Sequence, residues 1–325
     1  MPWKHWAVAR GRHWREVYWQ YLPQLKAAAY GWADMSNADD IREFLATRRA
    51  RLTPQEAGLP QFGGSRRVPG LRREEVSLLA GISVEYYARI ERGNARGVSE
   101  DVLASISRAL QLNEAEHAHL VDLLRVANEE RPPRRTTSRA EVRPGIRQIV
   151  DAMSGIAAFV RNGRSDVLYA NRLFEALYSD MYRDPARPAN AARFLFLDPR
   201  AQTFYPDWDT LIRDSVAALR SEAGRIPDDR GLSDLVGLLS TRSEAFRTLW
   251  ARHDVHLHRG GTKRFRHPLV GDLTLRFETF ALPADPGLAV VMYSAEPGSP
   301  SEAVLRDLDK WASTRQRLAP AEAAG

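Results

Sequence analysis

The spacing of hydrophobic residues between positions 38 and 127 indicates a series of short amphipathic helices. In residues 38–52 one face at helical spacing is apolar and arginines occupy the opposite face. The last two segments follow Ser99 and Asn113, residue types that commonly cap helix N-termini. The helices predicted in this way cover residues 38–52, 71–80, 84–93, 100–112 and 114–127.

Beyond residue 144 the pattern alternates between helical and strand periods. Two short apolar runs flank Asn162-Gly163, a dipeptide that strongly favours a β-hairpin. Helices are predicted over 144–153, 171–179, 189–197, 207–221, 231–240, 243–252 and 300–315. Further strands are predicted at 253–258, over 263–282 with a fold at Gly271-Asp272, and at 287–295. This order of elements predicts an antiparallel sheet with helices packed on one side.

Composition and charge narrow the function classes. No run of about 18 apolar residues is present, so the sequence predicts no membrane helix. The absence of cysteine excludes disulfide scaffolds, thiolate zinc sites and iron–sulfur clusters, and it favours a cytoplasmic location. Residues 1–140 contain 22 Lys and Arg against 17 Asp and Glu, whereas the remainder contains 25 against 24. The excess positive charge therefore lies in the first part, as expected if that part binds a polyanion.

Residues 71–93 carry the residue pattern of a helix-turn-helix motif. A small residue lies where the two helices cross, a glycine permits the left-handed turn, and a serine can cap the second helix. Apolar residues at helical spacing bury the inner faces of both helices. The residues in these positions are Val76, Leu79, Ala80, Gly81, Ile82, Ser83, Tyr87 and Ile90.

The second helix of such a motif enters the major groove of double-stranded DNA by its N-terminal end. The side chains that can reach base edges are those of Val84, Glu85, Tyr86 and Arg89. Phosphate contacts are expected from Arg66, Arg67, Arg73, Ser83 and Arg92. Two alternatives remain: the helix arginines pair with Glu85 or Glu91 on a solvated surface, or Tyr86 is partly buried.

The second half is rich in aromatic residues, which predicts an apolar cleft for a small ligand between the sheet and its helices. The alternative is that these side chains only fill the core. The candidate ligand residues are Phe159, Tyr169, Phe174, Phe196, Trp208, Phe246, Trp250, His253, Phe277 and Tyr293. Arg252, Lys263 and Arg276 are candidates for contact with a carboxylate, and His267 for a hydrogen bond to a ligand or to a turn of the domain itself.

The common catalytic motifs are absent, so we expect no catalytic residues, no enzyme activity and no cofactor. The run His253-Asp254-Val255-His256-Leu257-His258 is the one cluster with metal-binding potential, because alternate residues of a strand share a face. A polar surface strand explains the run equally well, and no metal is predicted.

The motif and its surroundings resemble a known family. The segments GLRREEVSLLAGIS and YYARIERG are similar to Xre/Cro-type regulators, while DVLYANRLFEALY, FRTLWARHDV and KRFRHPLVGDLTLRFETF resemble the MmyB-like branch. The resemblance implies a five-helix DNA-binding domain followed by a PAS-like ligand-binding domain. It also implies a fatty acid or similar apolar molecule as the effector.

The expected organisation has five parts. They are an atypical extension (1–34), a helix-turn-helix domain (35–128), a polar linker (129–143), the PAS-like domain (144–297) and a C-terminal helix and tail (298–325). The extension is either an amphipathic helix or the product of a mis-assigned start, with Met35 as the true initiator. The expected function is that of a homodimeric transcriptional regulator controlled by a small apolar ligand. The alternatives are a second half that only mediates dimerisation or protein contacts, and a metal-dependent enzyme.

Overall fold

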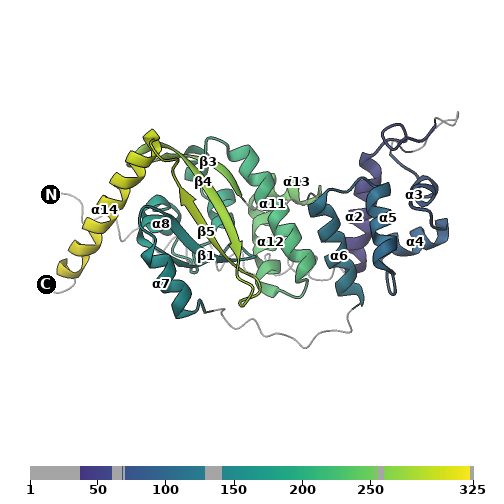
Figure 1. The fold of residues 1–325 in the computed structure, drawn as a ribbon, viewed down its shortest axis with the longest axis horizontal. Helices are drawn as coiled ribbons and strands as arrows, with labels where there is room; N and C mark the ends of the chain where they lie inside the picture. The colour runs from purple at the N-terminus through teal and green to yellow at the C-terminus, as the bar shows by residue number, and fades with distance from the viewer. Residues whose placement is uncertain are drawn as a thin grey trace.

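The computed structural model describes residues 37–60, 68, 70–128, 141–252, 254 and 260–322, with side chains described as far as residue 314. A helical domain and a sheet-containing domain lie side by side (Figure 1). Helices α3 and α4 occupy the end of the molecule away from the sheet, and α6 and α2 lie between them and the second domain.

The first domain consists of the predicted helices. They are α2 (Asn37–Arg51), α3 (Arg73–Ala80), α4 (Val84–Glu91), α5 (Glu100–Ala109) and α6 (Glu114–Asn128). Their apolar faces meet in one core that includes Ile41, Phe44, Tyr87 and Leu120, all nearly inaccessible to solvent. The predicted caps are present as well: Ser99 Oγ accepts a hydrogen bond from the Val102 amide, and Asn113 Oδ1 accepts one from the Glu116 amide.

The second domain is built on a five-stranded antiparallel sheet in the order β2-β1-β5-β4-β3. Its strands are β1 (Ala157–Asn162), β2 (Val167–Ala170), β3 (Gly260–His267), β4 (Gly271–Ala281) and β5 (Leu288–Ser294). The helices are α7 (Pro144–Ala152), α8 (Arg172–Leu177), α9 (Ala191–Leu197), α10 (Arg200–Phe204), α11 (Trp208–Arg225), α12 (Arg230–Arg242), α13 (Glu244–Trp250) and α14 (Pro300–Glu322), with a 3₁₀ turn η1 (Met181–Arg183).

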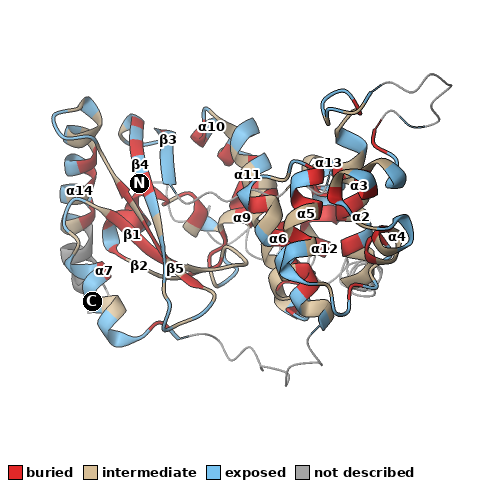
Figure 2. Cartoon of the chain, turned by 45° about the vertical axis from the view of Figure 1, so that its right-hand side comes forward, coloured by how far each residue is buried: buried red, intermediate tan, exposed pale blue. Residues whose placement is uncertain are grey.

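The alternation of β1 divides the buried residues between the two faces of the sheet. Ala157 and Phe159 join the large core with α8, α9 and α10, while Ala158 and Val160 pack with Val150 of α7. Helices therefore cover both faces rather than the single side that was predicted. Figure 2 shows buried residues gathered between the sheet and the helices and within the helical domain.

Some elements differ from the prediction. The short segments α10 and η1 were not predicted, and α14 continues well beyond residue 315. Of the strand predicted at 253–258, only Asp254 lies within the described residues, and it belongs to no strand. Leu305 and Leu308 of α14 are buried in the same core as β4 and α8, so this helix is packed into the second domain.

Candidate functional sites

The helix-turn-helix geometry follows directly from the residues that carry it. Gly81 has φ 68° and ends α3 in the left-handed conformation, which its missing Cβ makes inexpensive. Ser83 then caps α4 by accepting a hydrogen bond from the Tyr86 amide at 3.1 Å. Tyr87 and Ile90 bury the inner face of α4 completely. The chain thus turns sharply between two short helices and leaves the outer face of α4 free for recognition.

The residues predicted to meet bases lie on that outer face. Val84 and Glu85 are exposed on the first turn of α4, and Arg92 is exposed at its end. Tyr86 is half-buried, and the Arg89 guanidinium lies over its ring at 4.8 Å from the centroid. A cation–π contact of this kind holds the arginine in a defined orientation at the surface.

Glu91 explains why the arginines of α4 are available. The buried Glu91 carboxylate accepts hydrogen bonds from Arg49 of α2 at 3.1 Å and from Arg73 of α3 at 3.0 Å. Because Glu91 is engaged in this way, it does not neutralise Arg89 or Arg92, and neither arginine forms an ion pair within the described part of the chain. The alternative that these two arginines pair with Glu85 or Glu91 is therefore not what the structure shows.

Arg73 has a double role in this arrangement. Its hydrogen bonds to Glu91 raise the pKa of the guanidinium, yet about half of the side chain is exposed. Its predicted phosphate contact would use the remaining donors. Arg66 and Arg67 lie outside the described residues. Two further cations were missed by the sequence analysis.

The missed cations are Arg72 and Arg96, both exposed. Arg72 immediately precedes α3. Arg96 lies in the turn after α4, which is held to α6 by a 3.1 Å hydrogen bond from the Gly97 amide to Asn128. Their position in the short turns that flank the motif is the signal that could have identified them, because such turns approach the DNA backbone.

Most of the predicted ligand residues fall into two groups. Phe159, Phe174, Phe277 and Tyr293 meet in the core between the sheet and helices α8–α10, and the Phe159 and Phe174 rings stack at 4.1 Å. A second group surrounds α13: Phe246 and Trp250 are buried, and Phe196 contacts the Phe246 ring edge-on. Trp208 packs against the first core and donates a hydrogen bond to the Leu195 carbonyl.

Tyr169 belongs to neither group. It lies towards α7 and donates a 2.6 Å hydrogen bond to Asp151. His253 lies outside the described residues. His267, which was a candidate for a ligand or a turn, is buried against the Ala176 carbonyl at 3.1 Å, and burial lowers its pKa.

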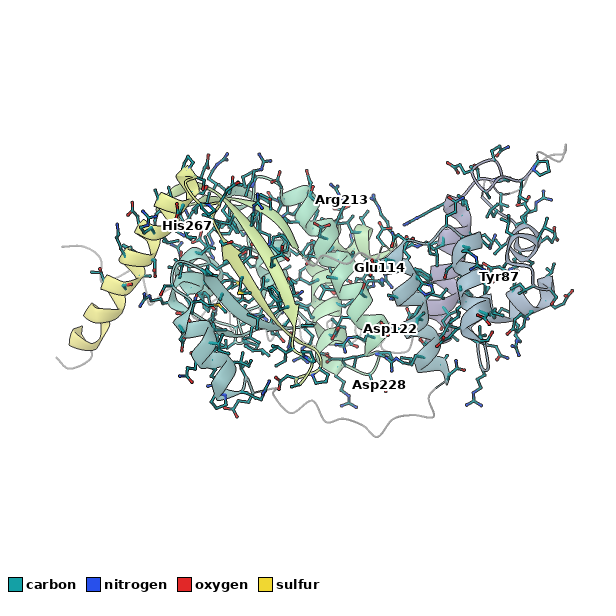
Figure 3. All side chains as sticks on the ribbon, viewed as in Figure 1. Tyr87, Glu114, Asp122, Arg213, Asp228 and His267 are labelled. Atoms are coloured by element: carbon teal, nitrogen blue, oxygen red, sulfur yellow. The ribbon has the colours of Figure 1, made fainter. Side chains whose placement is uncertain are left out.

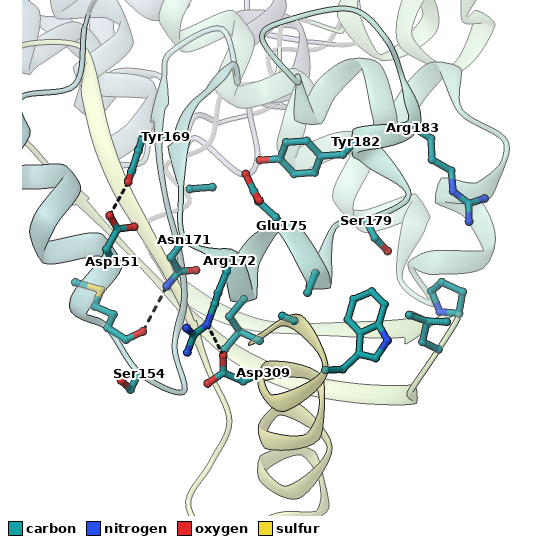
Figure 4. Close-up of a pocket in the computed structure, with 18 residues that line it drawn as sticks. Asp151, Ser154, Tyr169, Asn171, Arg172, Glu175, Ser179, Tyr182, Arg183 and Asp309 are labelled. Carbon is teal, nitrogen blue, oxygen red and sulfur yellow. Dashed lines mark hydrogen bonds and ion pairs between the residues drawn. The ribbon is translucent and has the colours of Figure 1, made fainter. Parts of the chain in front are cut away.

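Tyr169 instead lines a surface groove of about 1120 Å³ between α8, the turn after β3 and α14 (Figure 4). Its lining mixes apolar residues such as Leu269 and Trp311 with carboxylates. Asp309 is paired with Arg172 at 3.2 Å. The groove is wide and of mixed polarity, in contrast to the aromatic cluster.

The two domains contact each other directly through α11, on the side of the helical domain opposite to α4. Gly224 of α11 lies so close to α6 that a Cβ built on it would be 2.4 Å from His119. Nearby, burial raises the pKa of Asp122, a residue of α6 at the junction (Figure 3). The His119 and Leu123 side chains of α6 therefore pack directly against the backbone of α11 at Gly224.

Charged residues surround this contact. Arg220 of α11 is buried, stacks on Trp250 at 3.9 Å and donates a hydrogen bond to the Trp250 carbonyl. It faces Asp40 of α2, whose pKa burial raises to about 6 in spite of that arginine. Asp254, which follows α13, pairs with Arg51 of α2. The second domain therefore holds α2 and α6 by polar contacts as well as by packing.

Comparison with known protein families assigns both parts of the chain. A helix-turn-helix domain model matches residues 40–120. The model of the MmyB-like transcription regulator ligand binding domain matches residues 142–308, more than half of the chain. The chain belongs to the MmyB-like transcription regulators. A search of curated proteins finds no significant match.

As an MmyB-like regulator the chain combines a DNA-binding domain with a ligand-binding domain. No helix among the described residues is long and apolar enough to cross a bilayer. The described residues also contain no group of three or more His, Asp or Glu side chains placed to hold a metal. Of the His253–His258 run, only Asp254 is described, and it binds Arg51.

Proposed function

We propose that the protein is a cytoplasmic transcriptional regulator that binds double-stranded DNA as a homodimer and responds to a small apolar, fatty-acid-like ligand, without catalytic activity. The exposed first turn of α4 carries the proposal: Val84 and Glu85 face outward, and Arg89 is oriented on Tyr86. Two such helices, one from each protomer, would read two half-sites about one helical turn apart.

The aromatic cluster supports an apolar ligand better than the surface groove does. Its rings lie between the sheet and the covering helices, so a ligand held among them would have most of its surface buried. Phe196 packs against both the sheet-side core and the core around α13, so the two groups of aromatic residues are continuous. A ligand that separates these groups would shift α13 relative to the sheet.

The contact between α11 and α6 supports coupling of ligand to DNA. Trp250 ends α13 and stacks on Arg220, and Arg220 in turn faces α2. A displacement of α13 would therefore alter how the second domain holds α2 and α6. In a dimer this changes the separation of the two α4 helices, to which two-half-site recognition is sensitive.

The experiment compares operator affinity for the full chain with its pocket emptied and refilled. An operator is first selected from random DNA, and bound lipid is extracted and identified by mass spectrometry. We expect operator affinity to change about 5- to 150-fold on refilling, the usual range of allosteric coupling. Removal of residues 129–325 should leave weak DNA binding that no longer responds to the ligand. Identical affinity in both states would leave the second domain as a dimerisation or protein-contact domain.

A further inference from the structure

The core face of the sheet carries a lysine among aromatic residues. On β3, Lys263 shares its face with Phe265 and His267, both of which are buried, whereas Arg264 and Arg266 point outward. The Lys263 ammonium lies 5.5 Å from the ring centroids of Tyr205 and Tyr293 and 5.6 Å from that of Phe277. A lysine in such a position costs free energy unless its charge is compensated.

Within the described part of the chain, no side chain of opposite charge neutralises the Lys263 ammonium. Lys263 Nζ donates a 3.2 Å hydrogen bond to the Tyr293 hydroxyl, and no carboxylate of the described residues lies within ion-pair distance of it. Tyr178 also donates to the Tyr293 oxygen, at 3.1 Å. The two tyrosine hydroxyls therefore hydrogen-bond to each other, and the ammonium donates to the oxygen of one of them. Of the three N–H donors of the Lys263 ammonium, one has a hydrogen-bond acceptor among the described residues.

A second cation faces the same side of the sheet. Arg161 follows Phe159 by two residues on β1, and it pairs in register with Ala289 of β5, two residues from Val291 of the core. Burial lowers the pKa of Arg161, while Tyr293 and Glu222 act in the opposite direction. No hydrogen bond or ion pair joins Arg161 to another described side chain. Arg161 is therefore a second cation on the core face of the sheet that no described side chain neutralises.

We propose that Lys263 and the Tyr293 hydroxyl, assisted by Arg161, anchor the anionic head group of an amphiphilic ligand whose apolar part contacts the aromatic cluster. A carboxylate would accept a charge-assisted hydrogen bond from the ammonium, and the Tyr293 hydroxyl, rotated away from Tyr178, would donate to the same group. The inference rests on the proposed function, because it assigns the charge class and the anchoring residues of that ligand.

The experiment uses the full chain, a long-chain carboxylic acid and its methyl ester, with binding measured by calorimetry. The wild type should bind the acid about 10- to 100-fold more tightly than the ester, because charge-assisted hydrogen bonds are lost in the ester. Lys263→Gln should bring the two affinities together by weakening the acid alone. Lys263→Arg should retain most of the preference. The control is Arg266→Gln, which removes the same charge from the outer face of β3, where Arg266 pairs with Asp272 at 3.4 Å.

Ester affinity reports on the integrity of the pocket, so a merely structural role of Lys263 would weaken both ligands equally. Equal wild-type affinity for acid and ester, an unchanged ratio in Lys263→Gln, or binding of neither compound would overturn the anchoring site. Acid binding that depends on Lys263 but leaves operator affinity unchanged would support the anchoring site and refute the proposed regulation.

Discussion

Substitution of Gly224 by alanine should loosen the two domains from each other. The added Cβ would lie 2.4 Å from His119 Cε1, 2.7 Å from its Nδ1 and 3.3 Å from Leu123 Cδ2, so α6 or the histidine must move. His119 has little freedom, because it is buried and packs edge-on against Phe44 at 5.1 Å. Overpacking of this kind costs about 1–3 kcal/mol, against about 1 kcal/mol gained in helix propensity.

A matched control separates the steric clash with His119 from the gain in helix propensity that any Gly→Ala substitution in a helix brings. Gly145 of α7 is exposed and has open space around its Cβ position, so Gly145→Ala makes the same exchange without a neighbour. The free energies of unfolding of the two variants in urea should differ by about 1–3 kcal/mol. In a His119→Ala background the penalty of Gly224→Ala should disappear. If both glycine variants change stability equally, α6 and α11 do not pack as described.

Three other perturbations test the remaining parts. Arg89→Ala should weaken specific DNA binding by about 1–3 kcal/mol and relax one base position; an equal loss on operator and random DNA would make Arg89 a phosphate contact. Arg66→Ala combined with Arg67→Ala should make the salt dependence of DNA binding shallower by about two units, and an unchanged slope would exclude the loop from the interface. The pKa of Asp40 is raised from 3.8 to about 6 in the folded protein, which therefore binds its proton more tightly than the unfolded chain. The free energy of unfolding should consequently fall between about pH 4 and pH 7; Asp40→Asn should flatten that fall, and an unchanged pH profile would refute this assignment.

The first domain could be predicted closely because its signals are local. The turn at Gly81, the cap at Ser83 and the apolar spacing of Tyr87 and Ile90 all lie within one short segment. The ion cluster around Glu91 was not predictable in the same way. Its partner Arg49 is 42 residues away, and only the packing of α2 against α4 brings the two together.

The second domain was predicted in outline, with less success at the level of single residues. On β4 the buried residues alternate with exposed ones, as the period of a strand requires, but this periodicity could not show that Tyr169 turns away from the other aromatic residues. The contact between the domains left no recognisable pattern in the sequence. It depends on Gly224 and on the charged residues Asp40 and Arg220, which in isolation look like ordinary positions on helix surfaces.

The polar character of this contact has a consequence for regulation. Burying Arg220 and Asp40 costs desolvation energy that their attraction only partly offsets, so this charged pair contributes little to the net stability of the contact. Because α4 lies on the other side of the helical domain (Figure 1), the second domain does not cover it within one chain. Ligand control by direct blocking of α4 is therefore not available to the single chain, and control must act through the placement of whole domains. A ligand that favours one placement of the two domains by about 1–3 kcal/mol can shift the equilibrium between placements, provided that the contact between the domains is weak. A weak contact is therefore a condition for regulation of DNA binding by the ligand.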